Sequence, residues 1–351
     1  MTTALPRVAY YTHHHGSGHL RHALNIARLQ VVDLLVTGST EPAGLKTIPQ
    51  TRFAQLTIDT GPDGEPYPTP EEPFLHYAPT NSAIRHRFAE LHAAWRDFDP
   101  QVIIIDVSAE AAIFARLCGY PVIYRRMPGD RSDAVHELAY ASAAELVAYY
   151  PRHLEDSSFL EAYGHRTQHL GMLAPTGSAA TDSTKPGGRI ITVQTSLGGN
   201  GVNISDLAQA ARSCPSWQWN VAGLSTGSID LPPNVRLLGV LDDPSHELAT
   251  ADIIITSAGY HAVAAAAAAN RPTILVPEDR PFDEQAAFAR ALTSTAGIPM
   301  AENWSDVSWP DILRQAEALD ASALRQALFV NPESFKVGLL DLVSRVSGAG
   351  P

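Results

Sequence analysis

Apolar and polar stretches alternate along the chain in a way that predicts strands and helices in turn. Short apolar runs typical of buried strands occupy residues 8–11, 31–36, 101–105, 121–124, 189–194, 218–221, 234–238, 253–255 and 273–276. Helical spacing or an Ala-rich composition marks residues 20–28, 109–117, 205–212, 264–269 and 333–346. Strands that alternate with helices favour parallel sheets covered by helices on both faces.

The pattern starts twice, which predicts two similar halves. Each half opens with a strand, a Gly-rich turn and a helix, first at residues 8–28 and again at residues 189–212. The Pro-, Gly-, Ser- and Thr-rich residues 174–188 between them have the composition of a linker. We therefore predict an α/β protein with two Rossmann-like, doubly wound domains, 1–173 and 189–351. The last helix is expected to cross back onto the first domain, and the Pro- and Gly-rich residues 60–79 to form a long irregular loop.

Composition excludes several classes of protein. The formal net charge is −12 and no compensating run of Lys and Arg occurs, so a nucleic-acid partner is not expected. Cys118 and Cys214 have no metal-ligand spacing, which favours a reducing compartment without a disulfide framework. The sequence shows neither an apolar targeting core at residues 1–7 nor a run long enough to span a bilayer. We expect a cytoplasmic protein, and a peripheral contact with the inner face of the membrane stays open.

The second half carries a pattern suited to a nucleotide-sugar. Gly259 lies between a strand and a helix, where free backbone N–H groups and the helix dipole favour an anion such as a phosphate. The next strand ends at Pro277 and leads to Asp283, Glu284 and Gln285, whose acceptors and amide suit vicinal hydroxyls. The Gly-rich residues 196–201 lack the Lys of a P-loop; they allow a diphosphate to approach the backbone, or they are an ordinary turn.

The order of these motifs, from Gly16-Ser17-Gly18-His19 through Gly198-Gly199-Asn200-Gly201 and Ala258-Gly259-Tyr260 to Glu284-Gln285, resembles that of GT-B glycosyltransferases. The nearest pattern is glycosyltransferase family 28, which includes the peptidoglycan-precursor transferase and the galactolipid synthases. The resemblance implies two Rossmann-like domains facing a central cleft. It also implies inverting transfer of a hexosyl or N-acetylhexosaminyl group from a nucleotide diphosphate sugar, expected to be a UDP-sugar. The acceptor is a small-molecule or lipid-linked hydroxyl, and no metal or other cofactor is expected.

His19 and Asp106 are the candidate catalytic residues. A neutral imidazole at a helix start is suited to deprotonate an acceptor hydroxyl, and the resemblance implies that role for His19. Asp106 ends an apolar strand, where it would orient His19 as a triad carboxylate does. The alternatives are a hydrogen-bonded His without chemistry and an Asp that caps the helix near Ala109.

Binding residues are assigned to each side of the predicted cleft. Those expected to bind the donor are Ser196, Gly198, Gly199, Asn200, Gly259, Tyr260, His261, Asp283, Glu284 and Gln285. Those expected to bind the acceptor are Gly16, Ser17, Gly18, Arg126 and Arg131. Arg forks suit an anionic acceptor, but a solvated cationic loop at 125–131, paired with Asp130 and Asp133, explains the same residues. Asp283 is alternatively a helix cap, and residues 283–285 an exposed acidic helix start.

Two departures from the family pattern matter. Ala262 and Ala265 occupy positions where related enzymes usually carry Thr and the Glu that holds the ribose hydroxyls. Glu278 or Asp279 would have to replace that carboxylate, or nucleotide preference differs. A non-catalytic nucleotide-sugar binding protein is therefore one alternative. A sugar-nucleotide 2-epimerase shares the architecture and is a second alternative, although the sequence shows no clear set of acidic residues converging on the sugar. The five His residues at 13–22 do not favour a metal site, because adjacent residues of a strand point to opposite faces.

Overall fold

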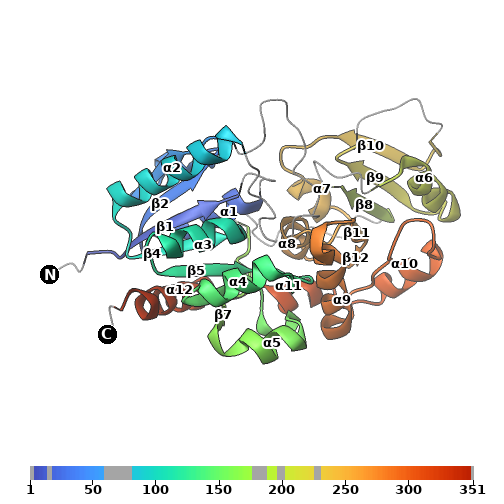
Figure 1. The fold of residues 1–351 in the computed structure, drawn as a ribbon. Helices are drawn as coiled ribbons and strands as arrows, with labels where there is room; N and C mark the ends of the chain where they lie inside the picture. The colour runs from blue at the N-terminus through green and yellow to red at the C-terminus, as the bar shows by residue number, and fades with distance from the viewer. Residues whose placement is uncertain are drawn as a thin grey trace.

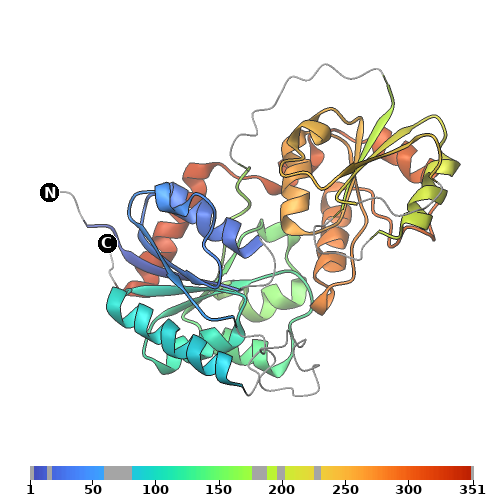
Figure 2. The ribbon, with the colours of Figure 1, turned by 90° about the horizontal axis from the view of Figure 1, so that it is seen from above.

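The computed structural model describes residues 4–13, 18–58, 81–175, 188–195, 202–224 and 231–348. Within these ranges the chain forms two parallel sheets that lie side by side, each covered by helices on both faces (Figures 1 and 2). This confirms the predicted class of two doubly wound α/β units. The predicted loop at 60–79, the linker residues 176–187 and the Gly-rich turn 196–201 lie outside the described residues.

The first sheet has seven parallel strands among the described residues, in the order β3-β2-β1-β4-β5-β6-β7. Its strands are β1 (Arg7–Thr12), β2 (Asp33–Gly38), β3 (Thr51–Gln55), β4 (Val102–Asp106), β5 (Val122–Arg126), β6 (Glu145–Ala148) and β7 (Thr167–His169). The helices between them are α1 (Gly18–Leu29), α2 (Ser82–Phe98), α3 (Ala109–Leu117), α4 (Ala134–Ser142) and α5 (Ser157–Tyr163). The strand order reverses between β1 and β4, which makes that pair the switch point where doubly wound sheets bind ligands.

The second sheet has five parallel strands in the described part of the chain, in the order β10-β9-β8-β11-β12. Its strands are β8 (Ile190–Gln194), β9 (Gln218–Ala222), β10 (Val235–Gly239), β11 (Ile253–Thr256) and β12 (Thr273–Leu275). The helices of this half are α6 (Ile204–Ser213), α7 (Ser245–Ala249), α8 (Tyr260–Ala269), α9 (Glu284–Ala296), α10 (Trp309–Glu317) and α11 (Ala323–Leu328). Here the order reverses between β8 and β11.

The last helix, α12 (Pro332–Ser347), returns to the first sheet (Figure 1). Its buried face, with Phe335, Leu339 and Leu342, packs in one cluster with strand residues such as Val8 and Ile104. The opposite face of that sheet is covered by α2, α3 and α4. Burial on both faces explains why central strands such as β2 and β4 are almost continuously apolar.

A third apolar cluster joins the two halves. It combines Ala148, Tyr150 and Met172 from the first half with residues of α8, α9 and α11. Met172 also pairs with Phe329 in an isolated parallel bridge just before α12 begins. The halves therefore share buried apolar surface as well as polar contacts. Among the described helices, none is both long and apolar enough to cross a membrane.

Candidate active site

Two candidate catalytic residues meet at the switch point of the first sheet. Thr12 and Asp106 are register partners at the carboxyl ends of β1 and β4. His19 lies in the first turn of α1, the helix that follows β1. Its Nδ1 is 3.0 Å from Oδ1 of Asp106, and the carboxylate is fully buried while the imidazole keeps 16% exposure. Because Nδ1 faces the carboxylate, it carries the proton, and Nε2 is the basic nitrogen.

Two further groups hold the same carboxylate. The Arg125 guanidinium donates to Oδ1 of Asp106 at 2.6 Å, and the Tyr10 hydroxyl donates to Oδ2 at 2.9 Å. Arg125 is itself buried, with its guanidinium 5.1 Å from the Tyr149 ring centre and 5.7 Å from that of Tyr260. Asp106 is thus a four-residue hub rather than half of an isolated pair.

The charges around Asp106 decide its protonation. Burial alone would raise the pKa of this carboxyl, but the Arg125 charge and the neighbouring His19 outweigh burial and hold the pKa well below its usual range. Asp106 is therefore ionised throughout the range in which proteins are stable. An ionised carboxylate next to Nδ1 fixes the orientation of the His19 ring.

The second half contributes the wall next to His19. His261, in the first turn of α8, is 2.9 Å through Nε2 from the carbonyl oxygen of Gly18. A Cβ on Gly18 would lie 3.1 Å from the His261 ring, so the two helix starts approach closely because residue 18 is Gly. The Tyr260 hydroxyl donates to the Tyr149 carbonyl oxygen at 2.7 Å. Burial lowers the pKa of His261 to about 4, so its ring is neutral at pH 7.

The candidate donor residues 283–285 start α9 and differ in environment. Gln285 is buried, and its Oε1 accepts hydrogen bonds from the backbone N–H groups of Ala258 and Glu278. Glu284 pairs with Arg131 of the first half, with 3.0 Å between Oε2 and the guanidinium. Asp283 stands at the N-cap position without a capping side-chain bond. The interpretation as an exposed acidic helix start is therefore wrong for Glu284 and Gln285.

The switch point of the second sheet carries buried polar atoms. Gln194 and Thr256 are register partners at the ends of β8 and β11, and Ser257 follows directly. Among the described residues, Gln194 Oε1, Thr256 Oγ1 and Ser257 Oγ are buried without a hydrogen-bond partner. Such atoms carry a free-energy cost unless another polar group satisfies them, so they mark a place suited to a polar ligand.

The fold and one sequence match identify the relatives of this chain. Residues 218–328 match the glycosyltransferase family 28 C-terminal domain. The glycotransferase of kitacinnamycin superposes with a TM-score of 0.70 and 18% identity, over 97% of this chain and 99% of that one. The chain has the GT-B fold and resembles glycosyltransferase family 28. The family match supports glycosyl transfer in general, and the structural likeness shows the fold.

Other GT-B structures are similar over their whole length. Acinetobacter baumannii MurG gives a TM-score of 0.60 at 14% identity, covering 97% of this chain and all of that chain. Phytolacca americana UGT2, complexed with UDP-2fluoro-glucose and pterostilbene, gives 0.64 at 16%, covering 99% of this chain and all of that one. At these identities the likeness shows the fold alone. No curated protein matches this chain in sequence.

Within the GT-B fold, the cationic segment 125–131 differs from its prediction. Strand β5 extends to Arg126, and Arg125, Arg126 and Arg131 are all buried. The solvated-loop interpretation is therefore wrong, and their carboxylate partners are Asp106, Glu155 and Glu284 in place of the predicted Asp130 and Asp133.

The Arg126 guanidinium donates to Glu155 Oε1 and to the Gly129 carbonyl oxygen, each at 3.0 Å. These internal partners would compete with an anionic acceptor, and the assignment of Arg126 to the acceptor stays a prediction. The alternative of Asp106 as a helix cap is wrong, because Ser108 caps α3 through its side chain.

Several predicted residues lie outside the described part of the chain. These are Gly16 and Ser17 on the acceptor side and Ser196, Gly198, Gly199 and Asn200 on the donor side. Their assignments stay predictions. Among the described residues no group of three or more His, Cys, Asp or Glu is arranged to hold a metal. His14 and His15 lie outside the described residues, so the metal-free expectation also stays a prediction.

Sequence reasoning missed Tyr10 and the role of Arg125. Tyr10 reads as an ordinary apolar member of a buried strand, and its hydroxyl gives no signal in the pattern. Arg125 did carry a signal, because a cation that follows Tyr124 in an apolar strand is unusual in a buried sheet.

Proposed function

We propose that the protein transfers a sugar from a nucleotide diphosphate sugar, a UDP-sugar, to an acceptor hydroxyl with inversion, and that His19 is the general base. The observation that carries this proposal is the contact between His19 Nδ1 and the buried, ionised Asp106 beside the second half. In this arrangement Nε2 accepts the acceptor proton while the hydroxyl oxygen attacks the anomeric carbon and the diphosphate leaves.

The donor is proposed to lie against the second half. The helix start after Gly259 offers backbone N–H groups toward the diphosphate, where negative charge develops as the bond breaks. Glu284 would accept hydrogen bonds from sugar hydroxyls. The Gln285 oxygen is occupied by backbone N–H groups, so its amide nitrogen is the atom left for a sugar. UGT2 bound to UDP-2fluoro-glucose supports the choice of UDP.

The residue that would bind the ribose hydroxyls is the part of the site that departs from the family pattern. Ala265 packs against the cluster that joins the halves and brings no carboxylate. Glu278 is buried and pairs with Arg280 at 2.8 Å, whereas Asp279 is exposed. We therefore propose Asp279 rather than Glu278 as the first residue to test for the ribose contact.

The test begins with thermal unfolding in the presence of UDP, UDP-glucose, UDP-N-acetylglucosamine and the corresponding TDP and GDP compounds. A ligand at 100 times its Kd stabilises by about 2.7 kcal/mol. The nucleotide-sugar that stabilises the protein is then offered with a panel of hydroxylated acceptors, and products are detected by mass. His19→Ala should keep the thermal shift and lose roughly 10²–10⁴ in turnover.

Each alternative has its own outcome. An isomeric nucleotide-sugar formed without any acceptor would indicate the epimerase. Tight binding without turnover on any acceptor would indicate the binding protein. Absence of a shift with every nucleotide would contradict the proposal.

A further inference from the structure

The turn that carries Glu284 has a backbone that needs outside support. Phe282 and Asp283 are consecutive residues with positive φ, 65° and 56°. Left-handed conformations cost non-glycine residues about 1–2 kcal/mol each, so they persist where neighbouring groups hold them. Within its own half the turn has the hydrogen bond from the Asp283 N–H to the Arg280 carbonyl oxygen, at 3.2 Å, and the ion pair of Asp283 with Arg290. Further contacts come from the other half of the molecule.

Gly129 and Asp130 fit against the turn through their backbones. The Asp130 N–H donates to the Phe282 carbonyl oxygen at 2.8 Å. Gly129 has φ +98°, and a Cβ there would lie 2.2 Å from the same oxygen and 3.0 Å from the Glu284 Cα. Only glycine allows this approach, because any side chain would overlap the backbone of the turn.

Arg131 fixes the side chains of the turn. Its guanidinium lies 4.4 Å from the Phe282 ring centre and donates to Glu284 Oε2 at 3.0 Å. On the other side it is 3.3 Å from Nε2 of His136, whose Nδ1 is 2.6 Å from Asp133 Oδ2. The Arg131 side chain is 5% exposed, whereas Glu284 keeps 27%. Arg131 is thus buried and oriented, and the Glu284 side chain stays partly exposed.

We propose that Arg131 is a positioning residue for the donor sugar, acting through Glu284, and that residues 129–131 and 282–284 work as one unit across the two halves. The proposal rests on the proposed function in one respect, that Glu284 accepts sugar hydroxyls. A buried Arg that donates to one carboxylate oxygen restricts the rotamers of the Glu284 side chain and leaves its second oxygen for another donor. A carboxylate held before the sugar arrives loses less conformational entropy on binding than a mobile one.

The proposal predicts different effects on the two parts of the donor, the sugar and the nucleotide diphosphate. Arg131 acts on the group that meets the sugar, so its loss should weaken binding of the sugar and leave binding of the nucleotide diphosphate unchanged. A merely structural role would weaken both equally, which makes the ratio of the two affinities the informative quantity.

The first arm of the test needs no ligand. Hydrogen exchange of peptides covering residues 278–290 is compared for wild type, Gly129→Ala and Arg131→Met. Gly119→Ala is the matched control, because Gly119 has φ +88° and a Cβ there would meet nothing within 4 Å. We expect faster exchange in the first two variants and wild-type exchange in the control. Unchanged exchange in both variants would overturn the proposal that residues 129–131 and 282–284 form one unit, whatever ligand the protein binds.

The second arm measures Kd for UDP-glucose and for UDP by calorimetry. Arg131→Met and Gly129→Ala are expected to weaken UDP-glucose about tenfold and to change UDP by less than about twofold. Arg131→Lys, which keeps the charge without the fork, should fall between them and wild type. Equal UDP-glucose affinity in wild type and variants would overturn the positioning role alone. Failure of wild type to bind either compound would contradict the proposed UDP-sugar donor, while the exchange arm still decides the unit.

Discussion

Asp106 is the residue on which the first switch point depends. Its carboxylate accepts from Arg125, His19 and Tyr10, and none of its surface is exposed. A buried charge is tolerated when partners of opposite charge and hydrogen-bond donors surround it, and it becomes costly when one is removed. The same carboxylate therefore serves folding, through Arg125, and the proposed chemistry, through His19.

Replacing Asp106 or Tyr10 should lower the stability of the protein. Asp106→Asn leaves the Arg125 guanidinium buried without its counter-charge, and we expect a loss of about 3–5 kcal/mol in the free energy of unfolding. Tyr10→Phe removes one hydrogen bond and should cost about 1 kcal/mol. Urea unfolding measures the loss of stability in each variant. Adding Arg125→Met to Asp106→Asn should recover part of the loss; a double variant less stable than the single would contradict the pairing.

His261 predicts a dependence of stability on pH. Its pKa is lowered from about 6.5 in the unfolded chain to about 4 in the folded protein, chiefly by burial. Between these values the unfolded state binds the proton and the folded state does not, so stability falls as pH decreases from about 6.5 toward 4. From pH 7 to pH 5, wild type should lose on the order of 1–2 kcal/mol more than His261→Asn. Equal losses in urea unfolding would show that His261 does not titrate this way.

Residue-scale contacts between the halves could not be read from the sequence. Arg131 and Glu284 are 153 positions apart, and Gly18 and His261 are 243 apart, and nothing local in either segment specifies its partner. The predicted pairing of His19 with Asp106 rests on the rule that ligand-facing side chains of open α/β sheets lie at the carboxyl ends of the strands. A general rule of sheet topology therefore predicts the contact of His19 with Asp106. No such rule predicts the contacts between the two halves, and only the structure shows them.

At the scale of elements, α12 shows how a helix can belong to a distant sheet. It buries Phe335 and Leu339 against strands of the first sheet, while Val337 faces solvent with 63% exposure. The apolar stripe of α12 packs against the apolar face of the first sheet, although the helix follows the second half in the sequence.

Two substitutions on α12 separate packing from helix formation. Leu339→Ala should destabilise by about 2–5 kcal/mol, because it opens a cavity in the cluster beside β1 and β4. Val337→Ala, two positions earlier and exposed, should change stability by less than about 0.5 kcal/mol. Chemical unfolding of the two variants gives the comparison. A loss in Leu339→Ala as small as in the control would mean that α12 does not support the first sheet.

The elements differ in how well the pattern predicted them. Strands such as β4 and β11 are short, continuous apolar runs, and the sequence located them to within a residue or two. Helix α2 was not predicted, because its charged residues and its place after a Pro-rich segment obscure the four buried positions Arg87, Leu91, Trp95 and Phe98. The predicted strand 121–124 ends two residues before β5 does, because Arg125 and Arg126 have the composition of a loop, and the sequence does not show their buried carboxylate partners.

For the whole molecule, the shared apolar cluster predicts unfolding as one unit. Tyr150 and Met172 from the first half and Phe288 and Leu328 from the second are buried together, so separating the halves exposes apolar surface of both. We expect calorimetric and van't Hoff enthalpies of unfolding to agree, with a single transition seen alike by fluorescence and circular dichroism. Two resolved transitions would contradict this coupling.

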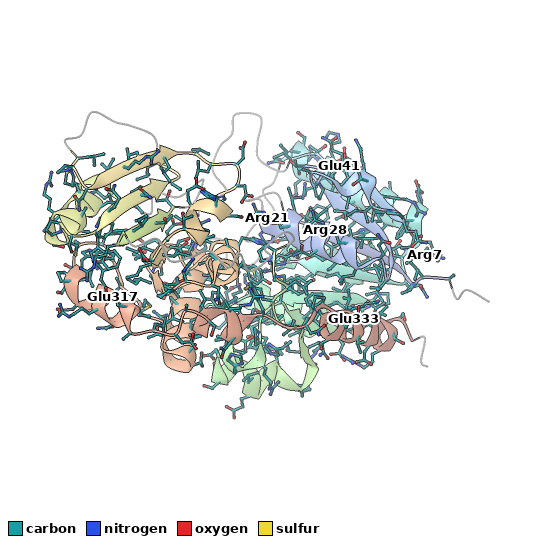
Figure 3. All side chains as sticks on the ribbon, turned by 180° about the vertical axis from the view of Figure 1, so that it is seen from behind. Arg7, Arg21, Arg28, Glu41, Glu317 and Glu333 are labelled. Carbon is teal, nitrogen blue, oxygen red and sulfur yellow. The ribbon has the colours of Figure 1, made fainter. Side chains whose placement is uncertain are left out.

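Polar contacts across the halves add to this coupling. Arg131 with Glu284, and His261 with the Gly18 carbonyl oxygen, join the segments that the proposed mechanism assigns to donor and acceptor. Figure 3 shows Arg21, also on α1, near the junction of the two halves, while Arg7 lies at the far end of the first sheet. The junction is therefore where the candidate chemistry and the contacts between halves coincide.

The position of α12 in the chain has a consequence for biosynthesis. Strands β1 to β7 are complete at His169, but α12, which together with α1 covers one of their faces, begins at Pro332, after the entire second sheet. A ribosome adds roughly 5–20 residues per second, so the nascent first sheet lacks α12 for on the order of ten seconds or more. During that interval the part of this apolar face that α12 covers, next to β4, is accessible to chaperones and to other nascent chains.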